Sequence, residues 1–141
     1  GVVNGLAAII PRMLAAGVGQ IVIISSVAGW RGLPKAAAYA PTKAALIALA
    51  ESLYFDLTPK NIKIQIMCPG FVDTEATAVN DFEMPDLLPA ETAADHIISG
   101  MASSVFSYDF PKSFTRKLKF LKFLPDRLYF ALVKKQTGAK S

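Results

Sequence analysis

The most constraining stretch of this 141-residue sequence covers residues 21–43. It begins with four branched apolar residues, Ile21–Ile24, a run typical of a strand buried on both faces of a parallel sheet. Two serines follow at the predicted strand end, and a glycine-containing loop then leads to Tyr39 and Lys43. The stretch therefore predicts hydroxyl groups at a strand end, close to a helix that carries a phenol and an ammonium group.

The segments around this stretch predict an α/β fold. Apolar residues recur at helical spacing from Val2 to Met13, and the pattern ends near Gly17. A long alanine-rich helix and a second strand follow, and then another helix, a half-buried edge strand and a tail. In order, we expect a helix over 1–17, a strand over 21–24, a helix over 36–57, a strand over 62–67, a polar loop over 71–88, a helix over 89–101, a strand over 105–110, and two helical pieces split by Pro125 within 111–135.

Two pairs of residues coincide with predicted strand ends. Ser25 and Ser26 follow the first strand, and Pro69 and Gly70 follow the second. Ligands of α/β sheets bind at the carboxyl ends of the strands. The alternation of helices and strands thus places a candidate site at this edge without any reference to a family.

Composition limits the other functions open to the chain. Hydrophobic residues make up 52% and charged residues 18%, and no apolar run reaches the length of a membrane span. One cysteine, Cys68, excludes an internal disulfide and fits a reducing, cytoplasmic location. His96 is the only histidine and has no second ligand near it in the sequence, so we expect no metal site.

Charge is divided unevenly along the sequence. Residues 1–110 carry six basic and ten acidic side chains, for a net charge of −4, and residues 111–141 carry nine basic and one acidic, for +8. The basic character belongs to the tail and does not indicate a nucleic-acid-binding domain. We therefore divide the chain into a catalytic part, 1–110, and a basic amphipathic helical tail, 111–141.

The chemistry of the central stretch comes from three side chains. Tyr39 and Lys43 are four residues apart and share one helix face. A nearby ammonium favours the phenolate, so such a tyrosine is suited to exchange a proton with a carbonyl or alcohol oxygen near neutral pH. Ser26, thirteen residues before Tyr39, is placed to hold the reacting oxygen.

Taken together, three motifs resemble the short-chain dehydrogenase/reductase family. They are the segment Ser25–Gly29, the pair Tyr39 and Lys43 in a Y-x-x-x-K pattern, and the segment Pro69–Thr74 in a P-G-x-V-x-T pattern. The resemblance extends from residue 1 to about residue 101 and is weaker in the tail.

The resemblance implies a Rossmann-type, doubly wound parallel sheet and reversible hydride transfer between NAD or NADP and a carbonyl or alcohol. It implies that Tyr39 is the general acid/base and that Ser26 orients the substrate oxygen. It also implies that Lys43 holds the nicotinamide ribose and lowers the pKa of Tyr39. The cofactor-binding residues would be Tyr39, Lys43, Pro69, Gly70, Val72 and Thr74. Val27 and Phe71 are candidate substrate contacts, and Phe82 is a further residue expected to line an apolar substrate pocket. Trp30 and Leu33 are candidates for contact with either the substrate or a neighbouring subunit.

The sequence departs from the family in its first part. No G-x-x-x-G-x-G turn for a dinucleotide occurs in it, and its first helix has no N-terminal cap. We therefore expect the chain to begin within a helix of a longer protein, with the glycine-rich turn and the family's catalytic asparagine before Gly1. The 141 residues alone are expected to be inactive.

Alternatives stay open for the function and for the tail. A family member that keeps the fold as a dinucleotide-binding scaffold is one alternative, and a membrane-peripheral scaffold protein dominated by its tail is another. The tail itself has two interpretations. Either it packs as a cover on the domain or on a partner subunit, or it forms a helix pair that lies on anionic membrane and admits lipophilic substrates. The alanine-rich helix favours a homodimer or homotetramer.

Overall fold

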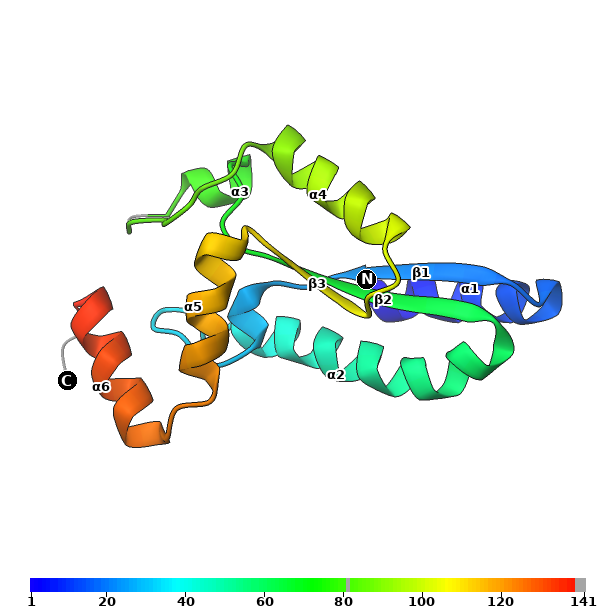
Figure 1. The fold of residues 1–141 in the computed structure, drawn as a ribbon, viewed down its shortest axis with the longest axis horizontal. Helices are drawn as coiled ribbons and strands as arrows, with labels where there is room; N and C mark the ends of the chain where they lie inside the picture. Colours follow the sequence, from blue (N-terminus) through cyan, green and yellow to red (C-terminus); the bar gives the residue numbers. More distant parts are fainter. Residues whose placement is uncertain (81, 139–141) are drawn as a thin grey trace.

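A parallel sheet of three strands forms the centre of the computed structural model, which describes residues 1–80 and 82–138 (Figure 1). The strands lie in the order β1 (Gly19–Ile24), β2 (Ile62–Pro69) and β3 (Ser107–Phe110). Helices α1 (Val2–Ala16) and α2 (Ala40–Leu57) share the hydrophobic core on one face of the sheet, and α4 (Ala90–Ala102) covers the other. The predicted α/β class with helices on both faces of a parallel sheet is confirmed.

Short helices connect and extend this framework. The remaining elements are η1 (Val27–Gly29), η2 (Thr58–Lys60), α3 (Glu75–Ala78), α5 (Lys112–Lys122) and α6 (Asp126–Thr137). Pro125 separates α5 from α6, as the sequence predicts. The last three residues of the predicted tail, 139–141, lie outside the described residues.

The central strand β2 is buried on both faces because it has a strand on each side and helices above and below. Ile62, Ile64 and Ile66 contribute to the core shared with α1 and α2. The alternate residue Gln65 points to the α4 side, where its amide donates to the carbonyls of Gly100 and Val105, each at 2.9 Å. This buried amide joins the end of α4 to the sheet.

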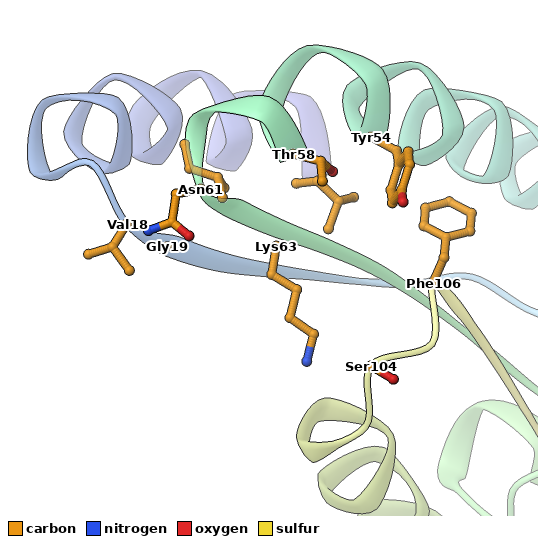
Figure 2. Close-up of a pocket in the computed structure, with 10 residues that line it drawn as sticks. Val18, Gly19, Tyr54, Thr58, Asn61, Lys63, Ser104 and Phe106 are labelled. Carbon is orange, nitrogen blue, oxygen red and sulfur yellow. The ribbon is translucent and has the colours of Figure 1, made fainter.

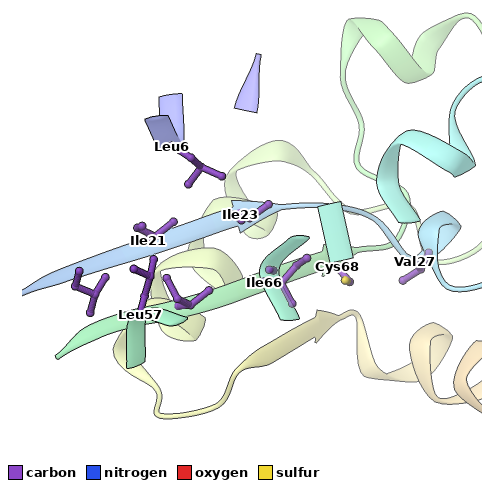
Figure 3. Packing of buried hydrophobic residues seen from close by; sticks show 10 residues of the cluster. Leu6, Ile21, Ile23, Val27, Leu57, Ile66 and Cys68 are labelled. Carbon is purple, nitrogen blue, oxygen red and sulfur yellow. The ribbon is translucent and has the colours of Figure 1, made fainter. Parts of the chain in front are cut away.

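The core lies between the sheet and the α1–α2 layer (Figure 3). Leu6 of α1 and Leu57 of α2 pack against Ile21, Ile23 and the inner side chains of β2. Burying side chains of this size contributes roughly 1.5–3 kcal/mol each. The core therefore fixes α2 against the sheet, and with it the residues at the start of α2.

Two expectations from the sequence are corrected. The strand β1 is not buried on both faces: Ile21 and Ile23 are buried, whereas Ile24 is 40% exposed. The cause is that α4, the helix on the face of Ile24, packs mainly on β2 and β3. The long helix begins at Ala40 and not at residue 36. Pro41 lacks a backbone N–H and fits only the first turn of a helix, which sets this start.

The tail is attached to the sheet through a buried carboxylate. Asp109 is 2% exposed, and its two oxygens contact Lys119 at 2.5 Å and Lys112 at 3.2 Å. Phe114 and Leu118 of α5 also pack on the hydrophobic core. Helix α5 therefore lies across the carboxyl end of the sheet, beside the loop that follows β1 (Figure 1).

Candidate active site

The two serines after β1 have different roles in the structure. Ser25 is 2% exposed, its N–H donates to the Met67 carbonyl at 2.8 Å, and its hydroxyl donates to the Lys43 carbonyl at 2.8 Å. That hydroxyl therefore joins the strand end to the first turn of α2. The adjacent residue, Ser26, is the one whose hydroxyl can serve a ligand.

Ser26 begins the short helix η1 in an extended conformation. Its Oγ accepts a hydrogen bond from the Ala28 N–H at 3.2 Å. No acceptor for its hydroxyl proton occurs in the part of the chain that the structure describes. The side chain is thus held in place while its proton can still be donated to a bound oxygen atom.

Tyr39 and Lys43 lie one turn apart at the start of α2. Tyr39 is the N-cap residue with helical dihedral angles, and its carbonyl accepts from the Lys43 N–H at 3.3 Å. The ammonium of Lys43 is 5.5 Å from the centre of the Tyr39 ring and donates to the Ile24 carbonyl at 3.3 Å. Tyr39 is half exposed, so its hydroxyl can reach a ligand in solution.

Gly29 allows η1 to lie directly on the start of α2. A Cβ at this position would come within 2.7 Å of the Lys43 carbonyl carbon and 2.8 Å of the Ala44 nitrogen. These are backbone atoms that cannot move without moving the helix. The close approach of these two backbones brings the Ser26 and Lys43 segments together.

The predicted cofactor residues lie at the same edge of the sheet. Pro69 ends β2, the strand next to β1, and Gly70 follows it. Gly70 also has a packing role, because a Cβ there would lie 3.0 Å from the Phe114 ring. Val72 forms an isolated bridge with Leu88, and the Thr74 side chain accepts from the Thr77 backbone at the start of α3.

The candidate substrate contacts separate into two groups. Phe71 lies with its ring centre 5.9 Å from that of Phe82 and 5.7 Å from that of Phe114, so three aromatic rings gather beside the strand end. Val27 is only 7% exposed and belongs to the hydrophobic core, and Trp30 packs against the same core. The structure therefore places Phe71 and Phe82 in an aromatic cluster and Val27 in the core, with Trp30 partly buried against that core.

Arg31 was not predicted from the sequence to have a role. One guanidinium nitrogen donates to the carbonyls of Leu121, Lys122 and Leu124 at 3.3, 3.0 and 2.6 Å, and the other contacts Asp126 at 2.5 Å. The group also lies 3.9 Å from the Tyr129 ring centre. Its partners are at least 90 residues away, so no local sequence pattern indicates this role.

Tyr129 strengthens the same junction. Its hydroxyl donates to the Gly32 carbonyl at 2.7 Å, and burial raises the pKa of this phenol despite the opposing effect of Arg31. The tail is thereby attached to the loop that joins Ser26 to Tyr39.

Two other titratable groups lie near the site. Burial raises the pKa of the Cys68 thiol to about 11, against the opposing effect of a hydrogen bond to Trp30. Burial also acts to raise the pKa of Asp109, but hydrogen bonds from Lys119 and Lys112 outweigh it and lower that pKa. Cys68 is therefore a core thiol and no nucleophile near neutral pH.

A groove of about 360 Å³ lies at the opposite end of the strands (Figure 2). Tyr54, Thr58, Lys63 and Phe106 are among its lining residues. The Lys63 ammonium is already bonded to the carbonyls of Met101 and Ser103, at 2.8 and 2.6 Å. The groove thus has no relation to Ser26, Tyr39 and Lys43.

Comparisons with known proteins agree with this geometry. An uncharacterized oxidoreductase of Myxococcus xanthus is 35% identical over 130 residues, which cover 92% of this chain and 51% of that protein. The 3-oxoacyl-(acyl-carrier-protein) reductase FabG of Chlamydia trachomatis is 39% identical over 79 residues, covering 55% of this chain and 32% of that protein. The chain thus spans about half the length of the Myxococcus xanthus relative.

A solved structure shares the fold. The short chain dehydrogenase of Burkholderia cenocepacia, in complex with NADP, superposes with a TM-score of 0.77 at 21% identity, covering 92% of this chain and 52% of that one. The family model described as short chain dehydrogenase matches residues 1–84, which include Ser26, Tyr39, Lys43 and Pro69–Thr74. The chain belongs to the short-chain dehydrogenase family.

Proposed function

We propose that this protein is an NAD(P)-dependent oxidoreductase that transfers hydride between a nicotinamide cofactor and a carbonyl or alcohol substrate. The observation that carries the proposal is the arrangement of Ser26, Tyr39 and Lys43 around the end of β1. The Lys43 ammonium is bonded to the Ile24 carbonyl beside Ser26, and it lies 5.5 Å from the Tyr39 ring. Relatives named as oxidoreductases support the same reaction class.

Each of the three residues has one role in this proposal. Tyr39 donates a proton to the carbonyl oxygen during reduction and accepts it back during oxidation. The positive charge of Lys43 favours the phenolate form of Tyr39. The Ser26 hydroxyl donates a hydrogen bond to the same oxygen and stabilises the negative charge that develops on it.

The residues at the strand ends fit a nicotinamide cofactor. Lys43 supplies donors for ribose hydroxyls, and Pro69, Gly70, Val72 and Thr74 form the adjoining segment after β2. Bound there, the nicotinamide ring supplies or accepts the hydride. The residues of this chain orient the substrate oxygen and move the proton, and NADP is the cofactor present in the similar structure from Burkholderia cenocepacia.

The substrate-binding side is proposed to be apolar. Phe71, Phe82 and Phe114 gather beside Gly70, and Phe114 comes from the tail. Aromatic rings of this kind bind the apolar part of a carbonyl compound and leave its oxygen to Tyr39 and Ser26. Residues 1–110 would carry the chemistry, with residues 111–141 completing this wall.

We also propose a homodimer or homotetramer. Val3 of α1 is 65% exposed and Phe55 of α2 is 76% exposed, and both lie on helix surfaces that no other described element covers. A second copy would bury these apolar side chains.

The test is Tyr39→Phe in the full-length protein. We expect turnover to fall roughly 100- to 10,000-fold, the usual range for removing a general acid/base, while NAD(P) binding measured by fluorescence titration is unchanged. Tyr54→Phe, a change of the same type at the far end of α2, is the matched control and should keep full activity. Near-normal turnover in Tyr39→Phe would exclude the proposed role.

A further inference from the structure

The outer surface of the α5–α6 pair combines exposed apolar side chains with unpaired positive charges. The pair lies at one end of the molecule, away from α1 (Figure 1). Five large apolar side chains are exposed, by 39–82%: Phe120, Phe123, Leu128, Phe130 and Leu132. We call this set, with the neighbouring basic residues Arg116, Lys117, Lys122, Arg127, Lys134 and Lys135, the tail surface.

The exposed aromatic residues of α5 lie on the side that packing does not use. Thr115 is fully buried, and Phe114 and Leu118 pack on the hydrophobic core. Phe120 and Phe123 are three residues apart and lie on the opposite side of the helix, 69% and 82% exposed. Their exposure is therefore set by the way α5 is attached to the sheet and not by a loose helix.

The positive charges of the tail divide in the same way. Lys112 and Lys119 are bonded to Asp109 and belong to the attachment. Within residues 1–80 and 82–138, none of the six basic residues of the tail surface forms an ion pair with an acidic side chain. Asp109 pairs with the cations that hold the tail, and the six basic residues of the tail surface add positive charge that has no acidic partner among the described residues.

A groove runs between the two helices. Its volume is about 440 Å³, and it is lined by Arg116, Lys117, Phe120 and Leu121 of α5 and by Gln136 of α6. Apolar side chains and two cations thus face the same space, an arrangement suited to a molecule with an anionic head and a hydrocarbon chain.

We propose that the tail surface docks onto a bilayer that contains anionic phospholipid. Aromatic and leucine side chains enter the interface, and the six cations are attracted to the lipid head groups. A second copy of the chain is a poorer partner, because a symmetric contact would place six unpaired cations against six others. Single-stranded nucleic acid would satisfy the charges but not the leucine side chains.

The docking is peripheral. Among the described residues, no helix is long and apolar enough to cross a bilayer. The proposal also does not depend on the chemistry of Tyr39, because it rests only on the exposure and charge of the tail.

Vesicle co-sedimentation tests the proposal. Purified protein is mixed with vesicles of phosphatidylcholine alone, or of phosphatidylcholine with 25% phosphatidylglycerol by mole. We expect binding to the anionic vesicles only, and its loss in about 0.5 M NaCl, where screening shortens the range of charge interactions. Arg116→Gln with Lys117→Gln should weaken vesicle binding at least ten-fold, because each basic residue near an anionic membrane surface strengthens binding about five-fold.

The apolar part is tested by Phe120→Ser with Phe123→Ser. We expect at least ten-fold weaker vesicle binding, because both side chains leave the interface. Ile98→Ser, 64% exposed on α4, and Lys60→Gln are matched controls that should bind as the wild type does. Circular dichroism shows that each variant is folded.

Three outcomes would overturn the proposal. One is equal binding to neutral and anionic vesicles, and another is binding that the four tail-surface substitutions leave unchanged. The third is a lack of binding to the anionic vesicles. In that case, tight binding of a single-stranded oligonucleotide would assign the surface to nucleic acid, and self-association lost in the Phe120→Ser, Phe123→Ser variant would assign it to a second copy.

Discussion

At the scale of single residues, the candidate site combines three residues proposed to carry its chemistry with two, Gly29 and Arg31, that hold its loop in place. Ser26, Tyr39 and Lys43 follow from their types and spacing, because a strand end and a helix start are recognisable locally. Gly29 and Arg31 act through contacts with distant backbone, at Lys43–Ala44 and at the end of α5. No pattern in the sequence reports such contacts, and only the folded chain reveals them.

Asp109 gives a prediction for stability. Its carboxylate is 2% exposed and bonded to two ammonium groups, and its pKa in the folded protein is lowered. Asp109→Asn should destabilise the protein by about 1–3 kcal/mol at pH 7, the usual range for a lost charged hydrogen bond in the interior. Urea unfolding with and without the substitution measures this difference.

The pH dependence of that difference has a defined sign. A carboxyl group with a lowered folded pKa contributes stability above its unfolded pKa, near 3.9, and loses that contribution as pH falls through the folded pKa. The difference in the free energy of unfolding between wild type and Asp109→Asn should therefore be largest at pH 7 and shrink below about pH 4. Asp56→Asn, an exposed control on α2, should unfold as the wild type does at pH 7; a gap that grows with acidification would contradict the assignment.

At the scale of elements, the strands and most helices follow from periodicity, and the errors have physical causes. The pattern of β1 is that of a doubly buried strand, yet α4 packs mainly on β2 and β3 and leaves Ile24 of β1 40% exposed. The start of α2 was predicted four residues too early, since alanines 36–38 favour a helix while Pro41 limits where it can begin. The end of α4 is held by the side chain of Gln65, which helix-capping patterns do not include.

The attachment of the tail to the loop between Ser26 and Tyr39 gives a second prediction. Arg31→Ala removes three hydrogen bonds to the end of α5 and the contact with Asp126. Losing about 2 kcal/mol of local stability should speed chymotrypsin cleavage within α5 and α6 roughly 30-fold, if cleavage follows transient opening. Arg31→Lys should also be cleaved faster, because an ammonium cannot reproduce the guanidinium fork.

The matched control is Arg12→Ala on α1, which should leave the cleavage rate unchanged. Cleavage of Arg31→Ala at the wild-type rate would show that Phe114, Leu118 and Asp109 hold the tail without Arg31.

At the scale of the whole molecule, the carboxyl end of the sheet gathers the candidate site and the tail together. The sequence indicates both parts, but not that they touch. The loop from Ser26 to Tyr39 contacts the tail through Arg31 and Gly32, at the same end of the molecule as α5 and α6 (Figure 1). The net charge of −4 over residues 1–110 and +8 over 111–141 makes this end the positive one.

This shared end has a consequence for kinetics. If the protein docks through α5 and α6, the end of the molecule that carries Tyr39 would face the lipid, and an apolar ketone or alcohol would reach Tyr39 from the bilayer and not from bulk water. The apparent KM should then follow the mole fraction of substrate in the vesicle and stay constant when the whole suspension is diluted. Rates measured at a fixed total concentration of substrate, while added lipid lowers its mole fraction in the vesicle, distinguish this two-dimensional encounter from ordinary solution kinetics. A KM set only by the total concentration would show that substrate arrives through water.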